Sequence, residues 1–226
     1  MTPRELWLSS TWPFVAAHLP PRPARVLEIG CGSAGGFVPA LRAAGYEAAG
    51  IDPEAPPGPE YHRTEFENYE PPNPVDVIVA CTSLHHVADL DVVLAHVAAG
   101  LGSAGTLVVV EWAWEQFDEP TAHWCFERLP ASDASSQPSW LHEQREHWIA
   151  SGRSWPEYRA AWAAEEALHT VEAIQTALGA KFATSEWSSA PYFFADLDGV
   201  TEADERAAIE TGRIQATGIH YVGTLR

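Results

Sequence analysis

The chain contains few basic residues, and this shortage limits the partners it can have. Among 226 residues there are 13 Lys and Arg against 31 Asp and Glu, which gives a formal net charge of −18. Binding to nucleic acid depends on Lys and Arg that displace phosphate counterions, and the sequence shows no cluster of these residues. We therefore expect no nucleic acid partner. The acidity favours solubility, or alternatively the attraction of a cationic or amine-bearing substrate.

Cysteines are scarce, and long apolar runs are missing. Cys31, Cys81 and Cys125 are odd in number and far apart, which argues against a disulfide framework and for a reducing cytoplasm. No run is long enough to span a bilayer, and residues 1–7 do not show a basic region followed by an apolar one. We expect a cytoplasmic protein with no membrane partner.

Glycines are concentrated after one short apolar segment. The stretch Val26-Leu27-Glu28-Ile29 predicts a buried strand, and Gly30, Gly32 and Gly35 follow it. A helix is expected over residues 35–44, with Gly45 ending it. A second apolar segment, residues 47–51, leads to Asp52, about where a ribose-binding carboxylate stands after a first strand-turn-helix unit.

Two kinds of cofactor suit this layout. The glycines satisfy GxGxxG, the pattern of nicotinamide dinucleotide enzymes. Glu28, however, occupies a strand position that is ordinarily apolar in those enzymes, and a buried charge costs several kcal/mol unless it is paired. S-adenosylmethionine carries a sulfonium and an ammonium group and lacks a pyrophosphate, so an acid beside the turn fits it better.

On these residues the chain resembles the class I S-adenosylmethionine-dependent methyltransferases. The resemblance implies that Glu28 lies near the methionine end of the cofactor, that the glycines let the backbone approach it, and that Asp52 binds the ribose. Ala34 stands where the family usually has glycine. An acid after the third strand commonly contacts the adenine amine, and Glu65 is favoured over Glu67. The predicted cofactor site comprises Glu28, Gly30, Cys31, Gly32, Asp52, Glu65, Phe66 and Cys81.

Further family blocks continue to residue 112. A strand over residues 75–80 runs into Leu84-His85-His86-Val87, an ending similar to that of many small-molecule members. A helix over residues 90–100 and a strand over 105–112 follow, with residues 102–105 as the turn between them. His85 and His86 are the candidate general bases, and their alternative interpretation is structural. His123, His142, Glu111 and Glu115 are further candidates.

The resemblance implies an α/β, Rossmann-like fold: a mostly parallel sheet of seven strands, helices on both faces and an antiparallel last strand. Helices are expected over 119–129 and 140–150, and one or two helices over 157–178. They form an insert between strands five and six, and the last elements are expected over 181–188, 201–211 and 218–223. We expect a single domain over 1–226. Its parts are an N-terminal lid or connector (1–24), a cofactor-binding core (25–112), a helical insert that caps the acceptor pocket (113–180) and a C-terminal part (181–226).

Aromatic residues and histidines of the insert raise two questions: whether the rings form a core or line a pocket, and whether the histidines bind a metal. Trp148, Trp155 and Trp162 recur every seven residues, which is typical of a helix core face but also suits rings that wall an acceptor pocket. His142 and His147 are five residues apart, so their side chains diverge by about 140° on a helix and cannot share an ion. We expect no metal.

The function implied is direct in-line transfer of a methyl group from S-adenosylmethionine to a small-molecule acceptor. The protein would align the reactants and exclude water, which can contribute about 7 to 11 kcal/mol. The alternatives are an NAD(P)-dependent oxidoreductase, based on GxGxxG and Asp52, and a non-catalytic protein that binds S-adenosylmethionine. A monomer or a homodimer is expected.

Overall fold

The computed structural model describes residues 1–131 and 139–226 and divides into two compact units. The first, here called the sheet unit, contains residues 11–112, 169–188 and 219–226. The second, the insert unit, contains residues 1–10, 113–168 and 189–218. The expected subdivision of a single domain at residues 24, 112 and 180 stays a prediction.

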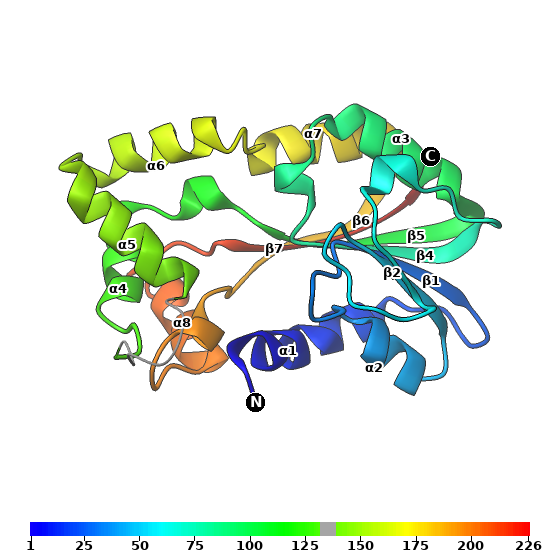
Figure 1. Ribbon diagram of the computed structural model, residues 1–226, viewed down its shortest axis with the longest axis horizontal. Helices are drawn as coiled ribbons and strands as arrows, with labels where there is room; N and C mark the ends of the chain where they lie inside the picture. Colours follow the sequence, from blue (N-terminus) through cyan, green and yellow to red (C-terminus); the bar gives the residue numbers. More distant parts are fainter. Residues whose placement is uncertain (132–138) are drawn as a thin grey trace. The chain divides into compact units, whose positions relative to one another are not determined.

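A seven-stranded sheet forms the centre of the sheet unit, in the order β3-β2-β1-β4-β5-β7-β6 (Figure 1). The neighbours from β3 to β5 are parallel. Hydrogen bonds join Arg226 to Lys181 and Ser185 to Val222, so β7 runs antiparallel to β6. This topology confirms the predicted fold class. The strands are β1 (Arg25–Ile29), β2 (Glu47–Ile51), β3 (Tyr61–His62), β4 (Val75–Cys81), β5 (Leu101–Trp112), β6 (Phe182–Ala190) and β7 (Gly218–Leu225).

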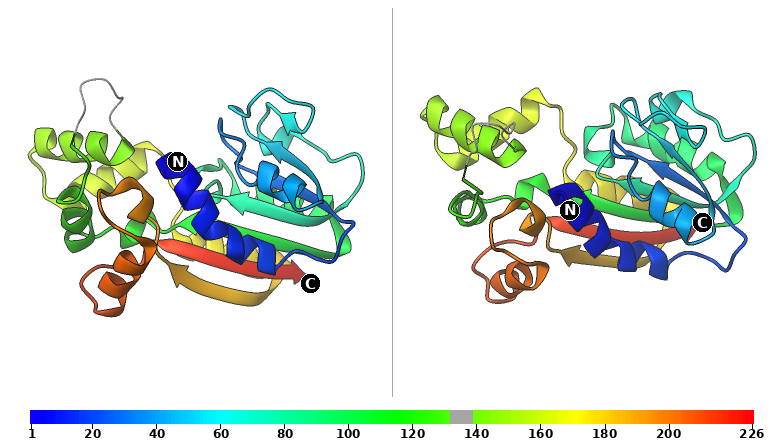
Figure 2. Two further views of the ribbon diagram at one scale, coloured as in Figure 1. Left: turned by 90° about the horizontal axis from the view of Figure 1, so that it is seen from below. Right: turned by 60° about the horizontal axis from the view of Figure 1, so that its bottom comes forward.

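Helices cover both faces of this sheet. Figures 1 and 2 show α3 and α7 on one face, with α2 and the end of α1 on the other. The central strands are buried on both sides, and Val77 to Ala80 of β4 are fully inaccessible, as expected of parallel strands between helix layers. The helices are α1 (Pro3–Ala17), α2 (Val38–Ala43), α3 (Leu90–Gly100), α4 (Glu119–Phe126), α5 (Trp140–Ser151), α6 (Trp155–Glu165), α7 (Val171–Lys181) and α8 (Glu202–Glu210).

One helix and one strand begin at residues other than those predicted. The helix predicted from residue 35 begins at Val38, because Gly35 and Gly36 have φ of 83° and 56°, outside the right-handed helical region. The strand predicted from residue 105 begins at Leu101, and the expected turn interrupts its register. Val75 pairs with Leu101 and Val77 with Thr106, so β5 contains more residues than β4 over this stretch.

The segment over residues 157–178, expected as one or two helices, forms two. α6 ends at Glu165, and Ala167 has φ of 53°, which breaks the helix. α7 begins after Thr170, whose hydroxyl accepts a hydrogen bond from Ala173 N–H at 3.2 Å.

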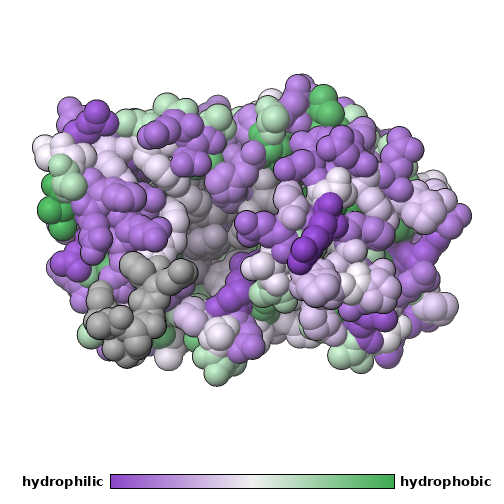
Figure 3. Space-filling view, in the orientation of Figure 1, coloured by the Kyte–Doolittle hydropathy of each residue, from purple (hydrophilic) through white to green (hydrophobic). Residues whose placement is uncertain are grey.

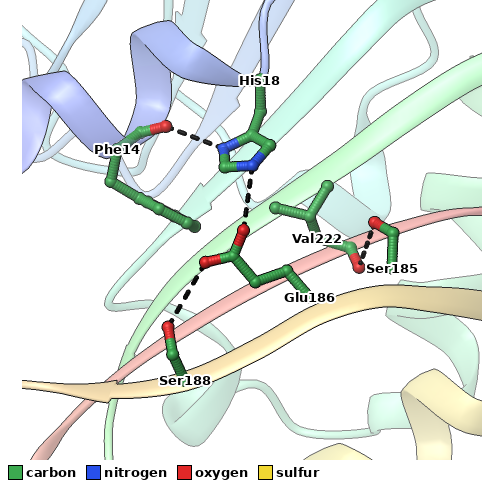
Figure 4. A network of polar contacts seen from close by, with 6 residues as sticks. All are labelled: Phe14, His18, Ser185, Glu186, Ser188 and Val222. Carbon is green, nitrogen blue, oxygen red and sulfur yellow. Dashed lines mark hydrogen bonds and ion pairs between the residues drawn. The ribbon is translucent and has the colours of Figure 1, made fainter.

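The end of α1 is fastened to the last two strands (Figure 4). The His18 ring hydrogen-bonds the Phe14 carbonyl through Nδ1 (2.9 Å) and the Glu186 carboxylate through Nε2 (3.1 Å). Ser188 donates to the other oxygen of Glu186 at 3.5 Å. The Phe14 ring stacks on His220 of β7, with centroids 4.0 Å apart. These contacts favour packing on the sheet as the role of this part of the N-terminal segment.

The insert unit has an aromatic core. Trp155 is 2% exposed and donates from its indole N–H to the Phe117 carbonyl at 2.7 Å. Tyr158 is buried too, and its hydroxyl donates to Gln144 at 2.8 Å. Trp148 packs edge-on against Trp155, with centroids 5.2 Å apart. Of the two hypotheses for the tryptophans of the insert, the core one is confirmed for Trp155, and the buried Tyr158 belongs to the same core.

The face drawn in Figure 3 is mostly hydrophilic, with small, scattered apolar areas. None of the helices in the described ranges is both long and apolar enough to cross a membrane.

Candidate functional site

The ends of three parallel strands bring the predicted cofactor residues to one edge of the sheet. Ile29 of β1 pairs with Ile51 of β2 and with Ala80 of β4. The residues that follow, Gly30, Asp52 and Cys81, therefore stand side by side. Ligands of open α/β sheets bind beyond this carboxyl edge.

The glycine turn needs glycine for two separate reasons. At Gly30, φ is 80°, and a Cβ atom would lie 2.7 Å from both the Cys81 carbonyl oxygen and the Ser83 Cβ. At Gly32, φ is 62°, and a Cβ atom would meet nothing within 4 Å. Gly30 thus lets two strand ends approach each other, whereas Gly32 leaves open space above its backbone.

Glu28 is fully buried and holds the start of α2. One of its oxygens accepts hydrogen bonds from Phe37 N–H (2.7 Å) and Val38 N–H (3.1 Å). A Cβ at Gly36 would lie 2.2 Å from the other oxygen, so the turn passes directly over the carboxylate. An acid at a helix N-terminus is stabilised by the unpaired N–H groups there. The sequence analysis expected a partner for this buried charge, and the backbone N–H groups of Phe37 and Val38 are that partner.

Asp52 is half-buried and ties β2 to the glycine turn. Its carboxylate accepts hydrogen bonds from Gly32 N–H at 2.9 Å and from Glu54 N–H at 2.8 Å. Burial, followed by the charges of Glu28 and Asp52, raises the pKa of the Cys31 thiol to about 12. Both carboxylates therefore lie near the same buried thiol, on which a negative charge is disfavoured.

Tyr61 of β3 contacts the glycine turn, and sequence reasoning missed it. Its hydroxyl donates to the Gly35 carbonyl at 3.4 Å, and a Cβ at Gly35 would lie 2.4 Å from the hydroxyl oxygen. Burial is the main cause that raises the pKa of Tyr61, and the charge on Cys31 adds to it. Only the pairing of Gly50 with Tyr61 brings this ring to the turn, and no local sequence pattern signals it.

The remaining predicted cofactor residues lie in different environments. Glu65 is exposed and immediately precedes a short 3-10 turn, Phe66–Asn68. Phe66 is 5% exposed and belongs to the hydrophobic core of the sheet unit, while Cys81 is fully buried. Of these side chains, only Glu65 is open to solvent.

The His85-His86 turn is held by the end of β5. Glu111 accepts hydrogen bonds from Leu84 N–H (2.8 Å), from Trp112 N–H (2.7 Å) and from the His85 ring nitrogen Nδ1. His85 and Glu111 are 3% and 1% exposed, so this pair is buried.

His86 differs from His85 in its exposure to solvent. It is exposed to solvent, and its ring is tilted by 43° against that of His85, with centroids 4.1 Å apart. Removal of water by the surrounding protein, and secondly the neighbouring His85, lower the pKa of His86 from 6.5 to about 4. Its imidazole is therefore neutral at pH 7.

A metal site is not found among the described residues. No group of three or more His, Cys, Asp or Glu in residues 1–131 and 139–226 has the arrangement of a metal site. His142 instead hydrogen-bonds Ser139 through Nδ1 (2.8 Å) and the Pro130 carbonyl through Nε2 (2.9 Å).

The carboxyl edge fits a nucleoside cofactor. The space above Gly32 admits close backbone approach, and Asp52 holds a half-buried carboxylate beside it. Helix α2 has no free N-terminus for a pyrophosphate, because Glu28 already occupies it. These features favour S-adenosylmethionine over a dinucleotide.

Comparisons with known proteins agree with this chemistry. The model of a family described as "Methyltransferase domain" matches residues 7–156, more than half of the chain. A comparison with curated proteins by sequence finds no match.

Several solved methyltransferases share the fold. An S-adenosylmethionine-dependent methyltransferase from Mesorhizobium loti is 19% identical, with a TM-score of 0.57 over 97% of this chain and 100% of that one. Geranyl diphosphate C-methyltransferase from Streptomyces coelicolor, in complex with Mg2+, geranyl diphosphate and S-adenosyl-L-homocysteine, is 14% identical (TM-score 0.54, covering 96% and 80%). The plantazolicin methyltransferase BpumL is 12% identical (0.52, covering 99% and 84%).

The family match and the geometry of the carboxyl edge lead to one identification, which replaces the nicotinamide and non-catalytic alternatives. The chain belongs to the methyltransferase-domain family and is an enzyme that uses S-adenosylmethionine.

Proposed function

We propose that this enzyme methylates a small molecule by direct displacement. The observation that carries the proposal is the charge of the chain, −18 with only 13 basic residues, which disfavours RNA and DNA as acceptors. Geranyl diphosphate and plantazolicin, named with two structural relatives, are consistent with such an acceptor.

The residues at the carboxyl edge take the following roles in the proposal. The backbone at Gly30 and Gly32 lies against the cofactor, Asp52 accepts hydrogen bonds from the ribose, and Glu65 from the adenine amine. Glu28 acts indirectly, by fixing the start of α2 and thereby the glycine turn. When bound, S-adenosylmethionine supplies an electrophilic methyl group.

The histidine turn supplies the candidate proton acceptors. A neutral imidazole can take the proton that a hydroxyl or amine nucleophile loses. His86 is neutral at pH 7, but its pKa of about 4 makes it a weaker base than an ordinary histidine. His85 keeps its Nδ1 on Glu111. Alignment of the acceptor and exclusion of water provide the rest of the rate enhancement.

The acceptor class is tested with methyl-labelled S-adenosylmethionine. The enzyme is incubated separately with a small-metabolite extract, total RNA and a protein extract. We expect label in the metabolite fraction alone. Label in RNA or protein, with none in metabolites, would refute the proposal. The heat-denatured enzyme is the blank.

The Asp52 assignment is tested by calorimetry with S-adenosyl-L-homocysteine. Asp52→Asn keeps the shape of the side chain but removes a charged acceptor, so we expect binding weaker by roughly 1.5 to 3 kcal/mol. The matched control is Asp76→Asn at the opposite end of the sheet, where the carboxylate accepts a hydrogen bond from Arg25 N–H at 2.7 Å. Equal affinities in the two variants would contradict the assignment.

A further inference from the structure

Glu111 gathers three donors from the ends of two strands. Leu84 N–H lies in the turn after β4, Trp112 N–H lies at the end of β5, and the third donor is the His85 ring. Each oxygen of Glu111 accepts a backbone N–H, from Leu84 on Oε2 and from Trp112 on Oε1, so we assign Glu111 as the acceptor and the proton of the third bond to Nδ1 of His85. Its Nε2 is then left as the acceptor nitrogen when the ring is neutral.

The turn that Glu111 holds is strained. Thr82 has φ of 47°, an unusual value for a β-branched residue. Such a conformation persists only where its surroundings hold it. Thr82 N–H donates to the Val110 carbonyl at 2.7 Å, so two successive residues of β5, Val110 and Glu111, hold the turn.

His169 closes the other side of this turn. Its backbone N–H donates to the His85 carbonyl at 2.9 Å, and its Nε2 hydrogen-bonds the Val87 carbonyl at 2.8 Å. The turn is therefore fixed from β5 through Glu111 and from the chain before α7 through His169.

The same turn lies against the glycine turn. A Cβ at Gly30 would be 2.7 Å from Ser83 Cβ and from the Cys81 carbonyl oxygen, so no space separates the two segments. A displacement of residues 82–86 is therefore transmitted to Gly30, whose backbone we assign to the cofactor.

We infer that Glu111 is a positioning residue for cofactor binding, which acts by fixing the 82–86 turn and the Nδ1-protonated tautomer of His85. The inference rests on the cofactor site proposed above. It does not depend on the identity of the acceptor, because S-adenosyl-L-homocysteine binding is measured without one.

The test compares two buried glutamates. Glu205, also 1% exposed, accepts hydrogen bonds from Tyr192 N–H (2.8 Å), Phe193 N–H (3.2 Å) and Phe194 N–H (2.6 Å) within the insert unit. Glu111→Gln and Glu205→Gln therefore remove the same kind of bond at two different places. Both should lower the Tm, but only Glu111→Gln should weaken S-adenosyl-L-homocysteine binding, by roughly tenfold.

Two outcomes of the calorimetry overturn the inference. One is wild-type affinity in folded Glu111→Gln, which would make Glu111 purely structural. The other is an equal loss in Glu205→Gln, which would make the effect a general destabilisation. A loss in Glu111→Gln together with unchanged affinity in Asp52→Asn would refute only the role given to Asp52.

A measurement on the unmodified enzyme covers the case in which Glu111→Gln does not fold. Long-range proton–nitrogen NMR identifies the protonated ring nitrogen of each histidine, and His85→Gln assigns the resonance. We expect a proton on Nδ1 of His85. A ring protonated on Nε2 alone could not donate to Glu111 and would overturn the inference.

Discussion

At the scale of single residues, burial decides which charged groups are available for chemistry. Glu28 and Glu111 are both inaccessible, and both are used by backbone N–H groups. Asp52 keeps part of its surface and stands beside the open space over Gly32. Glu28 and Glu111 therefore hold turns of the carboxyl edge, whereas Asp52, which also accepts from Gly32 N–H, keeps the exposure that its proposed contact with the ribose requires.

The environment of His86 predicts a pH dependence of stability. With its pKa lowered from 6.5 to about 4 in the folded enzyme, His86 binds fewer protons there than in the unfolded chain between these values. The contribution of the neutral ring is thus complete above pH 6.5 and is lost as the pH falls towards 4. Because the ring is exposed, we expect an effect below about 1 kcal/mol.

Urea unfolding at pH 7 and pH 5 measures this effect. The wild type should lose more free energy of unfolding than His86→Gln over this interval. Equal losses would show that His86 titrates at the same pH in the folded and unfolded states.

At the scale of elements, most boundaries follow from local sequence. Strands β1 and β4, helix α3 and the glycine turn lie close to where periodicity and glycine placement predict them. The predicted start of α2 was wrong by three residues, because two glycines at positive φ precede the helix and cannot be part of it. Positive φ is set by the path of the chain through each turn of the folded structure: Gly32 and Gly152 adopt it with nothing within 4 Å of a Cβ, whereas Gly36 lies over Glu28.

A pair of glycine substitutions separates the cost of a positive φ from the cost of steric overlap with a neighbouring side chain. Gly36 and Gly152 have similar φ, 56° and 64°, but a Cβ at Gly36 would overlap Glu28, whereas one at Gly152 meets nothing within 4 Å. Gly152→Ala should cost about 1 to 2 kcal/mol of stability. Gly36→Ala should cost about 1.5 to 3 kcal/mol more, because Glu28 can move away only by giving up its bonds to α2.

Urea unfolding of the two variants tests the comparison, with S-adenosyl-L-homocysteine binding as a second measurement. Similar losses of stability would mean that Glu28 does not press on the turn. Gly152→Ala should leave cofactor affinity unchanged.

At the scale of the whole molecule, the large negative net charge is expected to affect stability. A formal net charge of −18 implies self-repulsion, which salt screens. We expect the Tm to rise when NaCl is increased from about 20 mM to about 200 mM, by about 2 to 4 °C for each kcal/mol gained. Scanning fluorimetry measures this shift.

Sodium sulfate at equal ionic strength is the control for this experiment. Equal shifts in both salts indicate screening, and a much larger shift in sulfate indicates exclusion of the salt from the surface. No shift in either salt would contradict significant self-repulsion.

The sequence by itself determined the succession of strands, the glycine turn, the two acids of the cofactor motif and the histidine pair. These features depend on contiguous residues, whose spacing and conformational preferences can be read along the chain.

Only the tertiary structure decided which residues these features meet. Tyr61 against Gly35, Glu111 with His85 and the burial of Phe66 all depend on strand register and on side-chain direction. Each pairing joins segments far apart in sequence, and a strand sends alternate side chains to opposite faces. A shift of one residue in strand register would move these side chains to the opposite face of the sheet. Local sequence patterns therefore do not determine which residues they contact.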